Sequence, residues 1–361
     1  MRESLTKFIE TEIIPRYDAF DRGHQRDHIL AVIEQGMYLS RFYDVNPEII
    51  YVACACHDLG IREGREFHHL ASGRIIREEL DLSQWFSPEE IETIAEAAED
   101  HRASSDREPR TIYGKIVAEA DRQIVPETVI RRTVQYGLEH YPDLDREGQW
   151  ERTVEHLGRK YAEGGYLKLW IPESPNAARI AALRDIIADK DRLRPMFEVF
   201  YKEERYKMLL PQAKSLLDGE TDDVAAMANL SSLLHHTMEF WWTGFYRVMG
   251  EELVLGPFQG PVACTRIPYG KGVCGTAWKK GETVIVPDVE QFPGHIACSS
   301  RSKSEIVVPV RRGGRVIAVL DIDSDRLGAF DGTDGRYLEA VVELFCPQHT
   351  EKEIEQDEHT A

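Results

Sequence analysis

Residues 255–324 read LGPFQGPVACTRIPYGKGVCGTAWKKGETVIVPDVEQFPGHIACSSRSKSEIVVPVRRGGRVIAVLDIDS. Within them, 304–310 (SEIVVPV) and 315–323 (RVIAVLDID) are rich in β-branched residues, which favour strands. The two segments are joined by Arg-Arg-Gly-Gly at 311–314, and glycine pairs are typical of tight turns between antiparallel strands. The pattern therefore predicts a β-hairpin.

Three carboxylates belong to this hairpin. Asp321 and Asp323 lie two residues apart near the end of the second strand, so both side chains face the same side of the sheet. Glu305 opens the first strand. The sequence predicts that the three acids gather at the ends of paired strands, although spacing alone leaves open that they are simply solvated.

Three of the six cysteines, Cys264, Cys274 and Cys298, lie in the same stretch, and we expect each in a loop. They form no CxxC pair or Cys-His knuckle, which argues against a zinc site. Widely spaced thiols in a reducing compartment more often carry redox chemistry.

These residues also carry a resemblance. The motifs ACTRIPYGKGVCGTA, GHIACSS, SEIVVPV and VLDIDS, together with the upstream WTGFY, resemble the free methionine-(R)-sulfoxide reductases, a branch of the GAF-domain superfamily. The resemblance spans residues 210–345. The resemblance implies thioredoxin as the reductant. The strand-helix-strand pattern that closes on the hairpin independently predicts an α+β domain, with one central antiparallel sheet and helices on one face.

The resemblance also implies roles for individual residues. Cys298 would be the nucleophile, Cys264 the resolving thiol and Cys274 an auxiliary one. The remaining site residues would bind free methionine-(R)-sulfoxide, with the carboxylates on its polar groups and the aromatic rings on its thioether arm: Trp242, Tyr246, Glu305, Asp321 and Asp323. No cofactor is expected in this domain.

The N-terminal half has helical spacing of apolar residues and contains an ordered set of histidines and aspartates. The most informative pair is His57-Asp58, which follows the apolar run YVACAC. A buried aspartate is costly unless it is paired or bound to a metal. Imidazole and carboxylate ligands together suit a divalent ion such as Mn, Fe, Ni, Co or Mg.

The order H…HD…H…H…D over residues 20–130 resembles the HD-domain metal-dependent phosphohydrolases. The resemblance implies one metal held by His28, His57, Asp58 and Asp121. A second metal would be held by His69, chosen over its neighbour His68, and by His101. The substrate would be a phosphorylated small molecule. Three basic residues close to the ligands in sequence are candidates to contact its phosphate oxygens: Arg62, Arg65 and Arg102. Those three are equally consistent with solvated surface charge.

Composition sets the remaining limits. The chain has 361 residues and a formal net charge of −19, which disfavours nucleic acid and anionic membranes as partners. No apolar run approaches the about 20 residues of a membrane span, and we expect a cytoplasmic protein. We predict an all-α HD-type helical bundle at 1–205, the GAF-type domain at 206–347 and a disordered tail at 348–361. An alternative function is a phosphohydrolase regulated by a GAF domain that only senses redox state or a ligand.

Overall fold

The computed structural model describes residues 1–20, 24–105, 107–296 and 299–345. It divides the chain into two compact units, Met1–Phe197 and Glu198–Ala361. The boundary predicted after residue 205 and the observed division both fall inside one helix, α10 (Lys190–Leu217). The predicted tail at 348–361 lies outside the described residues and stays a prediction.

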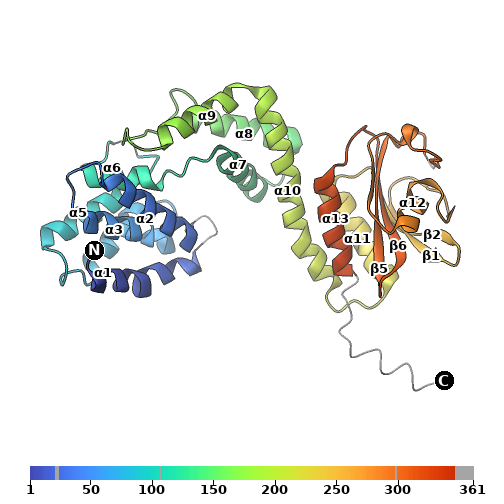
Figure 1. Ribbon diagram of the computed structural model, residues 1–361, viewed down its shortest axis with the longest axis horizontal. Helices are drawn as coiled ribbons and strands as arrows, with labels where there is room; N and C mark the ends of the chain where they lie inside the picture. The colour runs from blue at the N-terminus through green and yellow to red at the C-terminus, as the bar shows by residue number, and fades with distance from the viewer. Residues whose placement is uncertain (21–23, 106, 297–298, 346–361) are drawn as a thin grey trace, which may run out of the picture. The chain divides into compact units, whose positions relative to one another are not determined.

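The described part of the N-terminal unit is helical (Figure 1). Its elements, in chain order, are α1 (Glu3–Phe8), η1 (Ile9–Ile13), η2 (Ile14–Ala19), α2 (Arg26–Ser40), α3 (Pro47–Cys56), η4 (Leu59–Glu63), α4 (His68–Glu78), α5 (Pro88–Glu99), α6 (Ile112–Asp121), α7 (Pro126–His140), α8 (Arg146–Tyr161) and α9 (Asn176–Ala188). α10 follows. The all-α prediction for this half is confirmed.

Helix α3 is the centre of this unit because it is apolar on every side. Residues 49–56 are all buried, and α3 packs against α2, α5 and α6. The helix starts at Pro47, and the side chain of Asn46 accepts a hydrogen bond from the amide of Glu48 at 3.0 Å. The helix ends at Cys56. His57 and Asp58 follow directly and belong to the neighbouring cluster of polar residues.

The C-terminal unit is an α+β domain. Its elements after α10 are α11 (Asp223–Met238), β1 (Trp242–Met249), β2 (Glu252–Gln259), β3 (Arg266–Pro268), α12 (Gly272–Lys280), β4 (Val284–Val286), η5 (Val289–Gln291), β5 (Ser304–Arg312), β6 (Arg315–Ser324) and α13 (Gly332–Phe345). The sheet has the order β3-β2-β1-β6-β5-β4, and each neighbouring pair is antiparallel.

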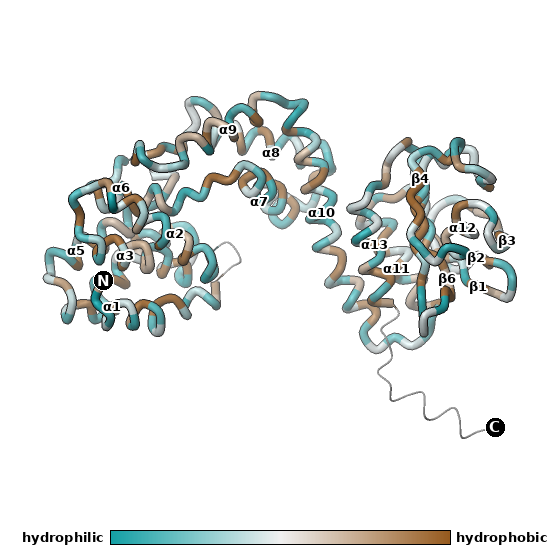
Figure 2. The backbone as a smooth tube through the Cα atoms, viewed as in Figure 1, coloured by the Kyte–Doolittle hydropathy of each residue, from teal (hydrophilic) through white to brown (hydrophobic). Residues whose placement is uncertain are grey.

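The predicted hairpin is confirmed as β5 and β6. Arg312 pairs with Arg315, and the two turn residues Gly313 and Gly314 have φ angles of 57° and 76°. This left-handed conformation at both positions is favoured by glycine and matches the twist of the strands. Hydrophobic residues are concentrated along the strands of the sheet (Figure 2).

The alternation of side chains along the hairpin separates two cores. Ile306 and Val308 pack with α11 and α13, whereas Val307 points to the opposite face, with Val273 and Ala277 of α12. Figure 1 shows α11 and α13 on one side of the sheet and α12 on the other. The prediction of helices on one face only was wrong. The segment that forms α12, with two glycines and a cysteine, lacks a strong helical signal and was predicted as loop.

No helix among the described residues is long and apolar enough to cross a bilayer.

Candidate active sites

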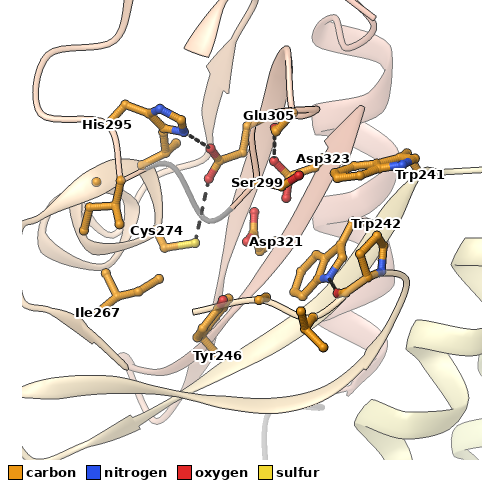
Figure 3. A pocket seen from close by; sticks show the side chains of 17 residues that line it. Trp241, Trp242, Tyr246, Ile267, Cys274, His295, Ser299, Glu305, Asp321 and Asp323 are labelled. Carbon is orange, nitrogen blue, oxygen red and sulfur yellow. Dashed lines mark hydrogen bonds and ion pairs between the residues drawn. The ribbon is translucent and has the colours of Figure 1, made fainter. Parts of the chain in front are cut away.

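A pocket lies on the face of the sheet that α12 covers (Figure 3). Residues of β1, β5, β6 and α12 line it together with the segments around Ala263 and Ile296. The lining residues that carry the argument below are Trp242, Tyr246, Cys274, His295, Glu305, Asp321 and Asp323.

The structure brings the three hairpin carboxylates together in this pocket. Asp323 pairs directly with Glu305 across the β5–β6 ladder. Asp321 lies two residues before Asp323 and on the same face of the sheet. Glu305 and Asp321 are each only 6% exposed. The alternative that these acids are solvated is therefore wrong.

Burial and mutual repulsion favour the protonated forms of these acids. Burial raises the pKa of Glu305 and of Asp321 well above the usual range, and the neighbouring carboxylates add to it. Burial raises the pKa of Asp323 to about 6, although the Ser302 hydroxyl donates a hydrogen bond to this carboxylate. Near neutral pH the pocket therefore holds at least one carboxyl group that can donate a proton.

Cys274 lies in α12, not in a loop as predicted, and its side chain is buried against the carboxylates. Its Sγ donates to Oε1 of Glu305 at 3.8 Å. Burial, reinforced by Asp321 and Glu305, raises the pKa of the Cys274 thiol well above its usual value. Cys274 is thus a neutral thiol, which makes it a poor nucleophile and a weak hydrogen-bond donor.

Two aromatic residues of β1 form another wall. The rings of Trp242 and Tyr246 lie 6.1 Å apart with an angle of 27° between their planes. Trp242 Nε1 donates to the carbonyl of Pro261 at 2.9 Å, and the Tyr246 hydroxyl donates to the carbonyl of Cys264 at 3.0 Å. These two hydrogen bonds hold the Cys264 segment against the pocket.

Of the two remaining predicted thiols, Cys264 and Cys298, the structure describes only the first. Cys264 is disulfide-bonded. Cys298, the predicted nucleophile, lies outside the described residues. The nearest described residues on either side of it, Ile296 and Ser299, both line the pocket.

In the N-terminal unit, Asp58 stands between two groups of side chains. Its Oδ2 lies 3.2 Å from Nε2 of His57 and 3.6 Å from Nε2 of His28. Asp121 joins this first group, with Oδ1 at 3.3 Å from Nε2 of His28. The other oxygen of Asp58, Oδ1, lies 3.3 Å from Nε2 of His101.

The second group departs from the prediction. Nε2 of His68 lies 3.4 Å from Oδ1 of Asp58 and 3.0 Å from Nε2 of His101, and His68 lines the adjoining cavity. His69 does not line it, and its Nδ1 is buried without a hydrogen-bond partner. His69 as a ligand therefore stays a prediction, and the contacts with Asp58 and His101 make its neighbour His68 the candidate that we propose here.

Three of these histidines are oriented in the same way. Nδ1 lies 2.8 Å from the carbonyl of Cys54 in His57, 2.5 Å from that of Ala98 in His101 and 2.7 Å from that of Arg65 in His68. With Nδ1 held at a backbone carbonyl, Nε2 is the ring nitrogen that faces Asp58 in each of the three. Backbone carbonyls fix metal-binding histidines in this manner in many proteins.

The residues fit a divalent metal. Nitrogen and carboxylate oxygen donors converge from buried and half-buried side chains, and Nε2 of both His28 and His57 is buried without a hydrogen-bond partner. Burial alone would raise the pKa of Asp58, yet the surrounding imidazoles hold it well below its usual value, so the carboxylate is ionised. Asp58 has one oxygen toward each group and would be among the residues that hold a divalent ion here.

The arginines predicted near this cluster separate into two kinds. Arg65 and Arg102 line the adjoining cavity. Arg62 instead lies on the exposed surface, where its Nη2 is 2.5 Å from Oε2 of Glu79. For Arg62 the alternative interpretation, solvated surface charge, fits better.

Comparisons with known proteins match both domains. The GAF domain model matches residues 226–345 and the HD domain model matches 26–123. GAF domain-containing protein A of Dictyostelium discoideum is 58% identical over 144 residues, 40% of this chain and 91% of that protein. The free methionine-R-sulfoxide reductase of Saccharomyces cerevisiae is 45% identical over 152 residues, 40% of this chain and 84% of the yeast protein. The chain belongs to this reductase family.

The match concerns the GAF region, hereafter the reductase domain. An X-ray structure of free methionine-R-sulfoxide reductase from Neisseria meningitidis in complex with its substrate is 54% identical, covering 38% of this chain and 84% of that chain, with a TM-score of 0.38. Both resemblances inferred from the sequence, to this reductase family and to HD domains, are confirmed.

Two residues of the reductase pocket were missed in the sequence analysis. Nε2 of His295 lies 3.9 Å from Oε2 of Glu305, and Ser302 donates to Asp323. His295 lies in the quoted motif GHIACSS and was passed over because no partner for it is close in sequence.

We expect Gly244→Ala to distort the reductase pocket. Gly244 lies opposite Asp321, and a Cβ atom there would come within 2.4 Å of Cβ of Phe258 and 2.7 Å of Cη2 of Trp242. The strain should cost about 1–3 kcal/mol of stability, seen as a lower melting temperature of the reductase domain. Gly332→Ala is the control, because a Cβ atom at Gly332 meets nothing within 4 Å. Equal melting temperatures for the two variants would contradict the close packing of this wall.

Proposed function

We propose that the reductase domain converts free methionine-(R)-sulfoxide to methionine. The observation that carries the proposal is the pocket itself, in which buried carboxylates face an aromatic wall beside Cys264. Carboxylates bind an α-amine, the rings of Trp242 and Tyr246 suit a thioether arm, and relatives named as free methionine-R-sulfoxide reductases support the substrate. A site built to receive a free amine would exclude a methionine within a peptide.

The chemistry would proceed by transfer of the sulfoxide oxygen to a thiol. The Cys298 thiolate attacks the sulfoxide sulfur, and after protonation the oxygen passes to the cysteine, leaving methionine and a sulfenic acid. The substrate sulfur gains two electrons and Cys298 loses two. The Cys264 thiol then attacks the sulfenic acid, a disulfide forms and water leaves. An external dithiol, which we propose to be thioredoxin in the cytoplasm, reduces the disulfide by exchange.

The pocket carboxyls supply the proton that the leaving oxygen needs. Burial raises the pKa of Asp323 to about 6, near neutral pH. Burial also raises the pKa values of Glu305 and Asp321 well above their usual range, so these groups add to the supply of protons. Cys274, protonated and hydrogen-bonded to Glu305, belongs to this network and is not proposed to be a nucleophile.

We expect Asp323→Asn to stabilise the reductase domain at neutral pH while weakening catalysis. The folded-state pKa of Asp323 is raised from 3.8 to about 6, so its contribution to stability is present below the unfolded pKa and is lost as the pH rises through about 6. The variant should therefore melt higher than wild type at about pH 8, with a flatter pH dependence, and lose about 10- to 100-fold in kcat/KM.

The matched control for this prediction is Asp325→Asn. Asp325 is exposed, and its Oδ2 lies 3.4 Å from Nη2 of Arg301, which is also exposed. Calorimetry of both variants from about pH 5 to 8 makes the comparison. If Asp323→Asn keeps the pH dependence of wild type, the raised pKa of Asp323 is not what destabilises the domain.

A coupled assay tests the proposed reduction. Purified protein is supplied with thioredoxin, thioredoxin reductase and NADPH, and with the free R epimer, the free S epimer or a peptide-bound sulfoxide in separate reactions. NADPH loss with the free R epimer alone supports the proposal. No turnover with any of the three would favour the alternative, in which the GAF region is a sensor and the HD domain is the output.

We propose a second activity, metal-dependent phosphohydrolysis, for the N-terminal domain. The observation that favours it is the carboxylate of Asp58, which faces histidine Nε2 atoms with both of its oxygens. When bound, a divalent metal would supply an activated water and offset the charge on phosphate. The protein holds the imidazoles with their Nε2 atoms inward and places Arg65 and Arg102 along the cavity that a phosphate would enter.

Metal analysis and phosphate release test this second activity. The protein is purified without chelator, its metal content is measured, and phosphate release from a panel of phosphate esters is followed after adding Mn, Fe, Ni, Co or Mg. Protein that binds none of these ions would remove the basis for the phosphohydrolase.

A further inference from the structure

The cavity beside the His/Asp cluster extends well beyond the cluster. Its lining includes His28 and Asp121 at one side, and residues of α7 and α8 at the other. These two helices span Pro126–His140 and Arg146–Tyr161, so they follow the region that the HD domain model matches, 26–123. A wall of the cavity is thus built by a part of the chain that the HD match does not include.

The charge of this lining is opposite to that of the whole chain. Its basic residues come from several elements and are Arg65, Arg102, Arg122, Arg132, Arg152 and Lys160. Among the described lining residues the only carboxylates are the two proposed metal ligands, Asp58 and Asp121. A basic cavity in a protein with a formal net charge of −19 indicates an anionic ligand.

Arg122 gives an independent indication. Arg122 is only 7% exposed, and its Nε and Nη1 atoms are buried without a hydrogen-bond partner. A guanidinium is always charged, and burying it without a partner costs several kcal/mol. An anion in the cavity would provide the missing hydrogen bonds.

Helices α7 and α8 contribute three basic residues to the cavity lining, and two of them, Arg132 and Lys160, are the candidates for binding an anion. Arg152 is already engaged, because its Nη1 donates to the carbonyl of Thr133 at 3.0 Å. Arg132 is exposed and Lys160 half-buried at the cavity. Burial and then the positive charges of Lys160 and Arg152 lower the pKa of the cavity residue His156 to about 4, which is consistent with a positive potential there.

We propose that the cavity contains an anion subsite formed by Arg122, Arg132 and Lys160, separate from the metal ligands, and that the substrate of the N-terminal domain carries a second phosphate. One phosphate would lie at the metal ligands and be hydrolysed, and the other would be held by the basic subsite. The inference deepens the proposed phosphohydrolase and rests on it for the cleaved phosphate. The substrate class is therefore a small molecule with two separate phosphate groups.

The first experiment measures binding without hydrolysis. Full-length protein is freed of metal with a chelator, and the affinities for inorganic pyrophosphate and for inorganic phosphate are measured by calorimetry. The test variant is Arg132→Gln with Lys160→Gln, chosen because Arg122 is buried and its replacement endangers the fold. Arg159→Gln is the control, because Arg159 is exposed on the same helix and does not line the cavity.

We expect pyrophosphate to bind more tightly than phosphate, and the double variant to weaken it at least about tenfold, since each charge-assisted hydrogen bond is strong. Arg159→Gln should change the affinity less than about twofold. Wild-type protein that does not bind pyrophosphate at millimolar concentration overturns the subsite. Equal weakening by the control and the double variant also overturns it, because the effect would then come from net charge.

The second experiment separates the subsite from the phosphohydrolase. With Mn²⁺ restored, hydrolysis of adenosine 3′,5′-bisphosphate is compared with that of adenosine 5′-monophosphate. The double variant should raise KM for the bisphosphate about tenfold and leave the monophosphate unchanged. An equal change for both overturns the inference. If neither is hydrolysed while the variant still weakens pyrophosphate binding, the subsite stands and the proposed phosphohydrolase fails.

Discussion

Replacing Cys298 by serine should abolish the proposed reduction of free methionine-(R)-sulfoxide, lowering kcat by at least about 10³-fold. The reason is chemical, because a hydroxyl at neutral pH does not attack the sulfoxide sulfur as a thiolate does. Substrate affinity should change little, since the carboxylates and the aromatic wall remain. Phosphate release by the N-terminal domain should not change. The measurements are steady-state reduction, equilibrium binding of methionine sulfoxide and phosphate release on the same preparation.

Cys346→Ser is the matched control for this variant. Cys346 lies outside the motifs of the reductase family, and we expect full activity after its replacement. Reduction that survives Cys298→Ser would show that another thiol is the nucleophile. Cys274 would be the first candidate, against the evidence that its thiol stays protonated.

We expect the replacement of Asp58 by asparagine to abolish the metal binding proposed for the N-terminal domain. Asp58 is 2% exposed and touches both groups of histidines, so the neutral amide removes one negative charge from each group at once. We expect metal content to fall below about a tenth of wild type and phosphate release to fall at least about 100-fold. Elemental analysis and phosphate release measure the two effects.

The control for the metal prediction is Asp44→Asn, because Asp44 is exposed after α2, outside the cavity lining. Methionine sulfoxide reduction by Asp58→Asn should remain within about twofold of wild type. Circular dichroism checks that the helices persist. Normal metal content in folded Asp58→Asn protein would contradict the ligand set described above.

The sequence predicted the reductase pocket well because strand periodicity places residues on faces. Once β5 and β6 pair, the period of two fixes Asp321 and Asp323 on one side, and Glu305 follows from the register. The same reasoning failed at Cys274. Its segment has no such periodicity, and only packing against Val307 and Val319 shows it to be a helix on that face.

The choice between His68 and His69 could not be made from the sequence. Adjacent residues on a helix point about 100° apart, so the ligand depends on where the helix begins. The structure begins α4 at His68, whose Nδ1 bonds to the carbonyl of Arg65. That hydrogen bond aims Nε2 at Asp58, a detail that depends on tertiary packing.

The basic cavity was missed for a related reason. Arg122, Arg132 and Lys160 are spread over 39 residues of the sequence, and each reads as ordinary surface charge in an acidic protein. Only the packing of α7 and α8 brings such residues to one space. Sequence reasoning detects sites whose residues share a local period or a family motif, and this wall has neither.

A single-turnover experiment tests the central claim most directly. Fully reduced protein, with no external reductant, is mixed with excess racemic free methionine sulfoxide, and both epimers and methionine are measured by chiral chromatography. The account predicts one equivalent of the R epimer consumed per chain, one equivalent of methionine formed, the loss of two free thiols and no change in the S epimer. Thiols that stay reduced while the R epimer persists would contradict it.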